Sequence, residues 1–278
     1  MGGNVPESMA GKVAGVSLAA GTTAAYMKAK SVSKMITPFR RAWELHLRRG
    51  LLDLERRAVG GGEWPFIYVA LGDSAAQGIG AASIEQGYVP RIAAGLRAVL
   101  GREVTLLNLS LSGATTESVL VTQLPQLEGL RVAGEPLRPD LVTLDIGGND
   151  VGLARLSEAE FADNAALIAE RLPTAAFVGN IPTFKPLPVA SRASRLSEHL
   201  TSAMRDGGHR VVDLQSVSEQ FSLWTYMARY HAPDMFHPNS PWYHRWSQLF
   251  MEAICERMGL ARIDMREVPA FDDELAVG

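Results

Sequence analysis

Short apolar runs alternate with helix-like segments through most of this chain, and this alternation constrains the fold more than any other feature. From residue 64 onward, five apolar runs of strand length lie at residues 66–71, 104–109, 141–146, 175–179 and 210–214. Between and after them, helical spacing or helix caps mark residues 89–100, 118–127, 157–172, 193–204 and 241–258. Strands that alternate with helices form a parallel sheet covered by helices on both faces. We therefore predict an α/β fold with a five-stranded parallel sheet.

Polar and glycine-rich residues directly follow three of the predicted strands. They are Gly-Asp-Ser at 72–74, Ser-Gly at 112–113 and Gly-Gly-Asn-Asp at 147–150. Taken singly, each is explained as well by a helix cap or a turn. In parallel α/β sheets, however, ligands bind beyond the carboxyl ends of the strands, where all three groups meet. Their common position predicts a functional site at that edge.

The residue types in these groups fit acyl transfer, which requires a nucleophile, a base, a group that orients the base, and donors for an oxyanion. Ser74 offers a hydroxyl, Gly113 a backbone N–H that no side chain obstructs, and Asn149 a side-chain amide. Near the C-terminus, Asp234 stands three residues before His237. One turn can place that carboxylate on Nδ1–H of the histidine and leave Nε2 free for the serine, which is the logic of a catalytic triad.

Other candidates for these roles are weaker. His231 lies three residues before Asp234 and could also reach it, but the order Asp-x-x-His favours His237. Lys185 either touches substrate or, as the more common case, is a solvated loop lysine. The remaining histidines fall in patterns typical of structural or exposed positions, and no cluster of Cys and His indicates zinc. We expect neither a cofactor nor a metal.

Four blocks of the sequence together resemble the SGNH/GDSL hydrolase superfamily. They are residues 72–80 (GDSAAQGIG), 108–116 (NLSLSGATT), 147–150 (GGND) and 234–237 (DMFH), in that order, and the similarity covers roughly residues 64–260. The resemblance implies a flavodoxin-like three-layer α/β/α sandwich. It also implies that Ser74 is the nucleophile, His237 the general base and then acid, and Asp234 its orienting partner. The oxyanion hole would consist of the backbone N–H groups of Ser74 and Gly113 and the amide of Asn149.

Three positions distinguish the chain from related patterns. The common α/β-hydrolase motif Gly-x-Ser-x-Gly is absent, because Ala76 stands where its second glycine is required. Within the SGNH/GDSL pattern, Ala75 stands where Leu or Ile is frequent, and we expect a change in packing alone. Trp242-Tyr243 stands where Gly-Tyr is usual, and we expect it to reshape the rim of the site without touching the triad.

The first 60 residues precede this pattern and predict an N-terminal helical extension. Residues 13–27 are uncharged, but as a helix they reach only about 22 Å against a hydrocarbon core of about 30 Å. From 38 to 59, apolar residues recur at helical spacing with six arginines between them. Such a basic amphipathic helix either packs on its own domain or makes peripheral contact with a membrane through residues 13–59. We expect a leader and helix over 1–60, ended by Gly60-Gly61-Gly62, a catalytic domain over 64–265 and a tail over 266–278.

The amino-acid composition argues against nucleic acid as a binding partner. With 27 Lys and Arg against 30 Asp and Glu, the chain lacks the excess of basic residues that nucleic-acid binding requires. The single cysteine, Cys255, cannot form an internal disulfide and is predicted to be buried. A cytoplasmic location and an association with the membrane or cell envelope both stay open.

The substrate is the least constrained part of the prediction. Residues 216–233 carry six large apolar side chains, which either wall an acyl pocket or pack on the core. We predict a serine esterase acting on a small-molecule ester with a short to medium acyl chain. An acyltransferase or a carbohydrate O-deacetylase would use the same site. A membrane-associated binding protein with a vestigial site is disfavoured, because all the catalytic residue types are present.

Overall fold

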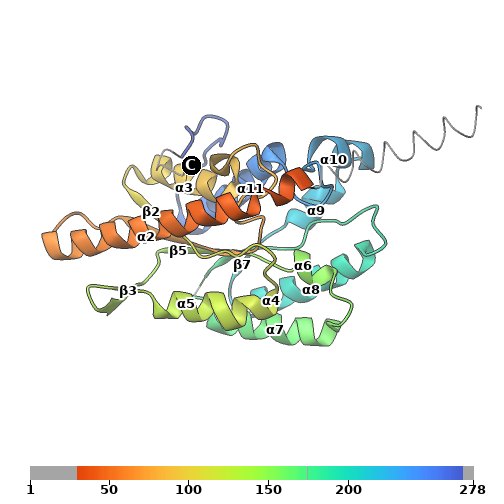
Figure 1. The fold of residues 1–278 in the computed structure, drawn as a ribbon, viewed down its shortest axis with the longest axis horizontal. Coiled ribbons are helices and arrows are strands. Elements are labelled where there is room, and N and C mark those ends of the chain that lie inside the picture. Colours follow the sequence, from red (N-terminus) through yellow and green to blue (C-terminus); the bar gives the residue numbers. More distant parts are fainter. Residues whose placement is uncertain (1–29, 174, 272–278) are drawn as a thin grey trace, which may run out of the picture.

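A five-stranded parallel sheet lies between two layers of helices in the computed structural model, which describes residues 30–173 and 175–271 (Figure 1). The strands are β1 (Phe66–Gly72), β2 (Val104–Asn108), β5 (Leu141–Asp145), β6 (Phe177–Gly179) and β7 (Arg210–Val212). Their order is β2-β1-β5-β6-β7, and every neighbouring pair is parallel. This is the flavodoxin-like order, in which ligands bind where the order reverses, here between β1 and β5. The predicted α/β/α fold is confirmed.

The helices form two layers because alternate side chains of each strand point to opposite faces of the sheet. One layer contains α2 (Ile36–Gly60), α3 (Tyr88–Leu100) and α11 (Ser240–Met258); the other contains α5 (Leu124–Gly129), α7 (Glu158–Arg171) and α8 (Ala190–Asp206). On β1, Phe66, Tyr68 and Ala70 belong to the core of the first layer. Ile67, Val69 and Leu71 of the same strand belong to the core of the second layer. All seven residues of β1 are therefore buried.

Helix α2 packs across the β2 edge of the sheet and contributes to both cores. Phe39 and Trp43 lie in one core and Leu54 in the other. Gly50 allows a close approach, since a Cβ there would lie 3.0 Å from the Leu107 side chain of β2. Trp43 Nε1–H also donates a 3.0 Å hydrogen bond to the Gln77 carbonyl. Of the two alternatives for the basic helix, packing on the domain is thus observed for its inner face.

The chain turns from α2 into β1 without a long connection. Gly61 takes the left-handed conformation (φ 71°) that ends a helix, and its N–H bonds to the Arg57 carbonyl. The glycines at 60–62 are therefore a helix C-cap followed closely by a strand.

No helix within the described ranges is both long and apolar enough to cross a membrane. The uncharged run 13–27 lies outside the described residues.

Several elements differ in extent from the sequence prediction. Strand β7 ends at Val212 because Asp213 caps the following helix α9 (Leu214–Glu219) by accepting from the Ser216 amide. Residues expected only as a connection form the hairpin β3 (Arg131–Val132) and β4 (Glu135–Pro136). The predicted helix 118–127 consists of three consecutive helical pieces: α4 (Thr116–Ser118), η2 (Val119–Gln123) and α5. The remaining short elements are η1 (Ile84–Gln86), α6 (Gly148–Val151) and α10 (Leu223–Arg229).

Candidate active site

Three loops meet at the carboxyl edge of the sheet, where the sequence predicted a site. Ser74 follows β1, Gly113 follows β2, and Asn149 lies in α6 directly after β5. The turn out of β1 requires glycine, because Gly72 has φ 141° and a Cβ there would overlap the Asp145 carbonyl oxygen. The Gln123 side chain fixes this turn through two 2.8 Å hydrogen bonds to the Gly72 backbone.

Ser74, His237 and Asp234 form a continuous hydrogen-bonded chain. His237 Nε2 lies 2.9 Å from Ser74 Oγ, and His237 Nδ1 lies 2.6 Å from Asp234 Oδ2. The other carboxylate oxygen, Oδ1, accepts 3.0 Å hydrogen bonds from the backbone N–H groups of Phe236 and His237. Burial acts to raise the pKa of Asp234, but these hydrogen bonds and the His237 charge outweigh it and lower the pKa below its ordinary value.

The loop that carries Ser74 is packed directly against the segment that carries His237. Gly80 (φ 96°) is the contact point, because a Cβ there would overlap the Pro238 carbonyl oxygen and lie 2.9 Å from His237 Cβ. Nearby, Tyr243 donates a 2.6 Å hydrogen bond from its hydroxyl to the Ile79 carbonyl. Sequence reasoning included Gly80 in the first block without assigning it a role, since nothing local indicates what it touches.

The three oxyanion-hole candidates differ in how their N–H groups are used. Within the described part of the chain, the backbone N–H groups of Ser74 and Gly113 have no acceptor. Gly113 is exposed and has φ 80°, which favours glycine. Asn149 Nδ2 donates to the Ala114 carbonyl at 2.8 Å and to Asp73 Oδ2 at 3.1 Å. The side-chain amide is thus held beside the serine loop by acceptors of the protein itself.

Two buried carboxyl groups lie close to Ser74 at the edge of the sheet, and sequence reasoning assigned a role to neither. Burial raises the pKa of Asp73 to about 6, although the Ala75 N–H and the His237 charge partly oppose the shift. Burial, and then the charge of Asp73, raise the pKa of Asp145 well above its ordinary value. Asp145 Oδ2 has no hydrogen-bond partner among the described residues. The available signal was an acidic residue inside the otherwise apolar run 141–146.

A cavity opens beside Ser74 and His237. One wall is the loop 181–187 after β6, and another is the segment 226–238 that leads into His237. Phe184 and Phe236 meet edge to face across these walls, with ring centroids 6.1 Å apart. The lining also includes the buried carboxyl group of Asp145 at the end of β5. The cavity is therefore lined mainly by apolar side chains, with a buried acidic group among them.

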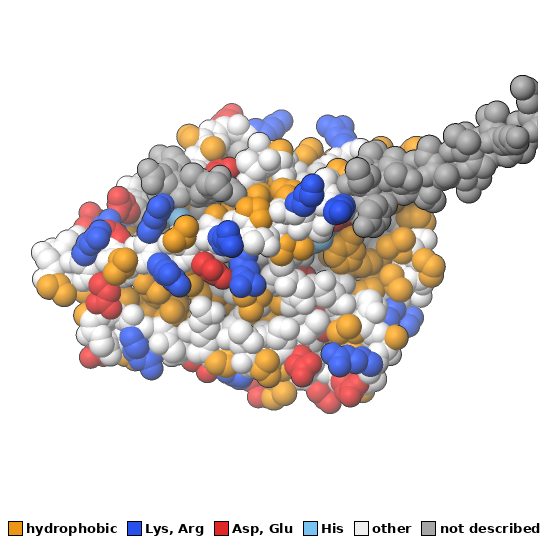
Figure 2. Space-filling model, viewed as in Figure 1, with side chains coloured by type: hydrophobic (Ala, Val, Ile, Leu, Met, Phe, Trp, Pro, Cys, Tyr) orange, Lys and Arg blue, Asp and Glu red, His pale blue; other side chains and the backbone are white. Residues whose placement is uncertain are grey.

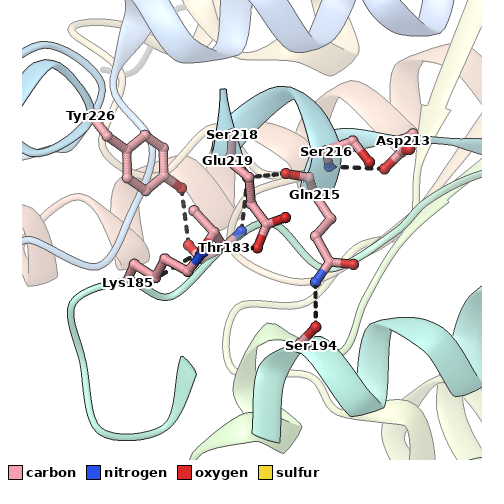
Figure 3. A network of polar contacts seen from close by, with 9 residues as sticks. All are labelled: Thr183, Lys185, Ser194, Asp213, Gln215, Ser216, Ser218, Glu219 and Tyr226. Atoms are coloured by element: carbon pink, nitrogen blue, oxygen red, sulfur yellow. Dashed lines mark hydrogen bonds and ion pairs between the residues drawn. The ribbon is translucent and has the colours of Figure 1, made fainter. Parts of the chain in front are cut away.

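The 181–187 wall is fixed by helices α9 and α10 (Figure 3). The Thr183 amide donates to Ser218 Oγ at 2.8 Å, and the Tyr226 hydroxyl donates to the Thr183 carbonyl at 3.2 Å. Lys185 lines the cavity, but its side chain is 63% exposed and its ammonium lies 3.3 Å from Glu219. Lys185 is thus a solvated, paired lysine at the cavity entrance.

The large side chains of residues 216–233 divide between the two expected roles. Tyr226 and Met227 line the cavity, whereas Phe221 and Tyr230 pack on the buried ring of Trp242. Trp224 does neither and is 84% exposed.

Four expectations about other residues are also resolved. Trp242 and Tyr243 were expected to reshape the rim, but both are buried: Trp242 lines the cavity from within, and Tyr243 bonds the Ser74 loop. Ala75 is buried in the core, as expected of a packing position. His231 Nδ1 lies 3.0 Å from the Tyr226 carbonyl, whereas the hydrogen bonds of Asp234 come from Phe236 and His237. Cys255 is buried, as predicted.

A family model described as the GDSL-like Lipase/Acylhydrolase family matches residues 70–245, more than half of the chain. The chain belongs to this family. As a member of the GDSL-like lipase/acylhydrolase family, it is an ester-hydrolysing enzyme. No protein with a curated description matches the sequence.

Solved structures share the fold of this GDSL-like enzyme at low sequence identity. An alpha/beta hydrolase from the metagenome of Lake Arreo is 22% identical, with a TM-score of 0.53 over 67% of this chain and 94% of the other. The lipase/acylhydrolase from Enterococcus faecalis is 21% identical, with a TM-score of 0.51 over 71% and 98%. An acetylxylan esterase from Geobacillus stearothermophilus is 18% identical, with a TM-score of 0.51 over 68% and 93%.

Proposed function

We propose that this enzyme is a serine esterase that forms an acyl-enzyme on Ser74. One observation carries the proposal: the Ser74 hydroxyl, the His237 ring and the Asp234 carboxylate are joined by hydrogen bonds of 2.9 and 2.6 Å. In this geometry, His237 Nε2 accepts the hydroxyl proton as Oγ attacks the ester carbonyl. Asp234 holds Nδ1–H and stabilises the imidazolium that forms. His237 then returns the proton to the departing alcohol, and water releases the acyl group by the same steps.

We assign the oxyanion hole to the N–H groups of Ser74 and Gly113 and the side-chain amide of Asn149. The two backbone groups support this assignment because neither has an acceptor among the described residues, so both can donate to a developing oxyanion. Asn149 already donates to Ala114 and Asp73. It would exchange one of those acceptors for the oxyanion during the reaction.

The cavity walls favour an acyl group of short to medium length. Ile181, Phe184, Met227 and Phe236 offer apolar surface, while Asp145 adds a buried carboxyl group to the lining. An alkyl chain long enough to cover this carboxyl group would desolvate it without offering a hydrogen bond, which is unfavourable. The same polar lining makes carbohydrate O-deacetylation the second candidate, since hydroxyl groups can hydrogen-bond to Asp145. An acyltransferase would share the acyl-enzyme and replace water by an alcohol.

The test is hydrolysis of p-nitrophenyl esters from acetate to palmitate by the wild type, Ser74→Ala and Ser112→Ala. Ser112 is a matched control, because its hydroxyl lies at the same edge but bonds to Gln77 Oε1. We expect Ser74→Ala to lose roughly 10⁶-fold in kcat, the scale of other serine triads, and Ser112→Ala to stay close to wild type. Wild-type turnover by Ser74→Ala would overturn the mechanism.

Further arms of the same assay address the substrate. Equal rates from acetate to palmitate would overturn the chain-length preference. Acetylated xylo-oligosaccharides test deacetylation, and added alcohol tests acyl transfer through the yield of a new ester.

A further inference from the structure

The outer face of α2 carries a regular stripe of arginine and apolar side chains. Three of its apolar residues are unusually exposed: Leu45 at 52%, Leu52 at 57% and Val59 at 84%. At 100° per residue, they fall within about 80° of the helix circumference together with three arginines. We call these six residues the outer stripe: Arg41, Leu45, Arg48, Leu52, Arg56 and Val59.

The inner face of the same helix already accounts for its packing. Phe39, Trp43 and Leu54 are buried in the cores, on the side of the helix opposite the outer stripe. The domain therefore does not need Leu45, Leu52 or Val59 for its own core. Figure 2 shows this side of the molecule, with basic side chains spread along α2 and hydrophobic ones between them.

The charges on α2 leave the outer stripe strongly cationic. The helix has six arginines and three acidic residues, whereas the whole chain has a formal net charge of −3. Its acidic residues are occupied: Glu44 pairs with Arg40, Asp53 pairs with Arg57, and Glu55 accepts from the Ala133 amide. In the described part of the chain, no acidic group pairs with the three arginines of the outer stripe.

We propose that the outer stripe docks this enzyme on a membrane surface that contains anionic phospholipids. Arginines complement the headgroup phosphates, while leucine and valine side chains between them enter the boundary between headgroups and acyl chains. A nucleic-acid backbone would match the arginines but would leave the apolar side chains in water. The alternation of both residue types on one face therefore fits a lipid surface better than a soluble polyanion.

The test is co-sedimentation of the full chain with vesicles of phosphatidylcholine alone or with added phosphatidylglycerol. Two triple variants divide the outer stripe: Arg41→Gln/Arg48→Gln/Arg56→Gln removes its charge, and Leu45→Gln/Leu52→Gln/Val59→Gln removes its apolar surface. Arg138→Gln/Arg155→Gln/Arg205→Gln is the matched control, because it removes three exposed arginines outside α2. Hydrolysis of soluble p-nitrophenyl butyrate, unchanged in all three variants, verifies folding.

We expect wild-type binding to require phosphatidylglycerol and to weaken in high salt. Loss of the three arginines should lower the membrane partition coefficient by about a hundredfold. This follows because each basic residue near an anionic surface typically contributes a similar, roughly fivefold, gain in binding. The apolar variant should also bind more weakly than wild type, and the control should bind like it.

Three results would overturn the proposal. The first is wild-type protein that binds neither vesicle, or both equally. The second is an arginine variant that binds like wild type, which would assign any binding to another segment. The third is loss in the arginine variant alone, with competition by heparin, which would identify a polyanion site instead.

Discussion

Two acidic residues lie near Ser74, and their pKa values shift in opposite directions: Asp234 is linked to the serine through His237, and Asp73 directly precedes it in the chain. Asp234 accepts three hydrogen bonds through His237 and Phe236, and its pKa lies below the ordinary value. Asp73 also accepts hydrogen bonds, from Ala75 and Asn149, yet burial raises its pKa to about 6. Burial opposes ionisation in both. The difference is that the donors outweigh burial at Asp234 and not at Asp73.

The comparison separates two uses of an acidic residue. Asp234 stays ionised and can stabilise a positive charge on His237. Asp73 and Asp145 are both buried, and their ionisation in the folded state is costly because burial raises both pKa values. We infer that Asp73 acts as a positioning residue through its hydrogen bond to Asn149, and that Asp145 adds a pH-dependent cost to folding.

The strongest way to break this comparison is Asp234→Asn. The variant keeps the shape of the side chain but removes the charge and offers His237 the wrong hydrogen-bond partner. We expect kcat for p-nitrophenyl butyrate to fall by about 10⁴-fold, as in other triads. If kcat of Asp234→Asn falls by less than about tenfold, a small change in packing is enough to explain the loss. That result would contradict a role of Asp234 in the triad.

A smaller effect is expected for Asp73→Asn. The new amide replaces one carboxylate oxygen by a donor, so it cannot accept from both Ala75 and Asn149. Removing an oxyanion donor typically lowers kcat by 10²- to 10³-fold, and we expect this loss for Asn149→Ala. For Asp73→Asn we expect kcat to fall by less. The double variant should be no slower than Asn149→Ala, because both changes act through the same amide. Additive losses would contradict a positioning role.

The smallest effect is expected for Asp145→Asn, and it is one of stability. Because the folded-state pKa of Asp145 is raised, its contribution to stability is fully present below the unfolded value of about 3.9 and is lost as pH rises. An asparagine at this position does not ionise, so the variant has no such loss. The Tm of the variant should therefore exceed that of the wild type by more at pH 8 than at pH 5. Each kcal/mol of difference in the free energy of unfolding corresponds to about 2–4 °C. A constant difference between the two pH values would contradict a buried, costly ionisation.

The strands of this fold were predictable because burial on both faces leaves a continuous apolar run. Leu141 to Ile146 shows the limit of that rule: Asp145 lies in the run, and the pattern identifies the strand without explaining the acid. The hairpin at 131–136 was missed because Gly134 and Pro136 are equally typical of an irregular connection. Its two strands have only two residues each, too few for a sequence pattern to distinguish a hairpin from an irregular connection.

The candidate site divides in the same way between local and long-range information. Asp234 and His237 are three residues apart, so their contact could be predicted from spacing. The contact of Gly80 with Pro238 joins two distant parts of the chain, and the spacing of residues carries no sign of it. The hydrogen bond from Asn149 to Asp73 likewise depends on β1 and β5 being neighbours, which only the sheet order reveals.

The position of α2 against β2 has a consequence for shortening the protein. Strand β2 is one of the two edge strands of the sheet, and an uncovered edge strand offers free backbone groups to a second copy. A fragment that begins at residue 61 would lose Phe39, Trp43 and Leu54 and leave that strand without its cover. We expect such a fragment to aggregate by edge-to-edge pairing, so the shortest useful piece for expression begins before Phe39.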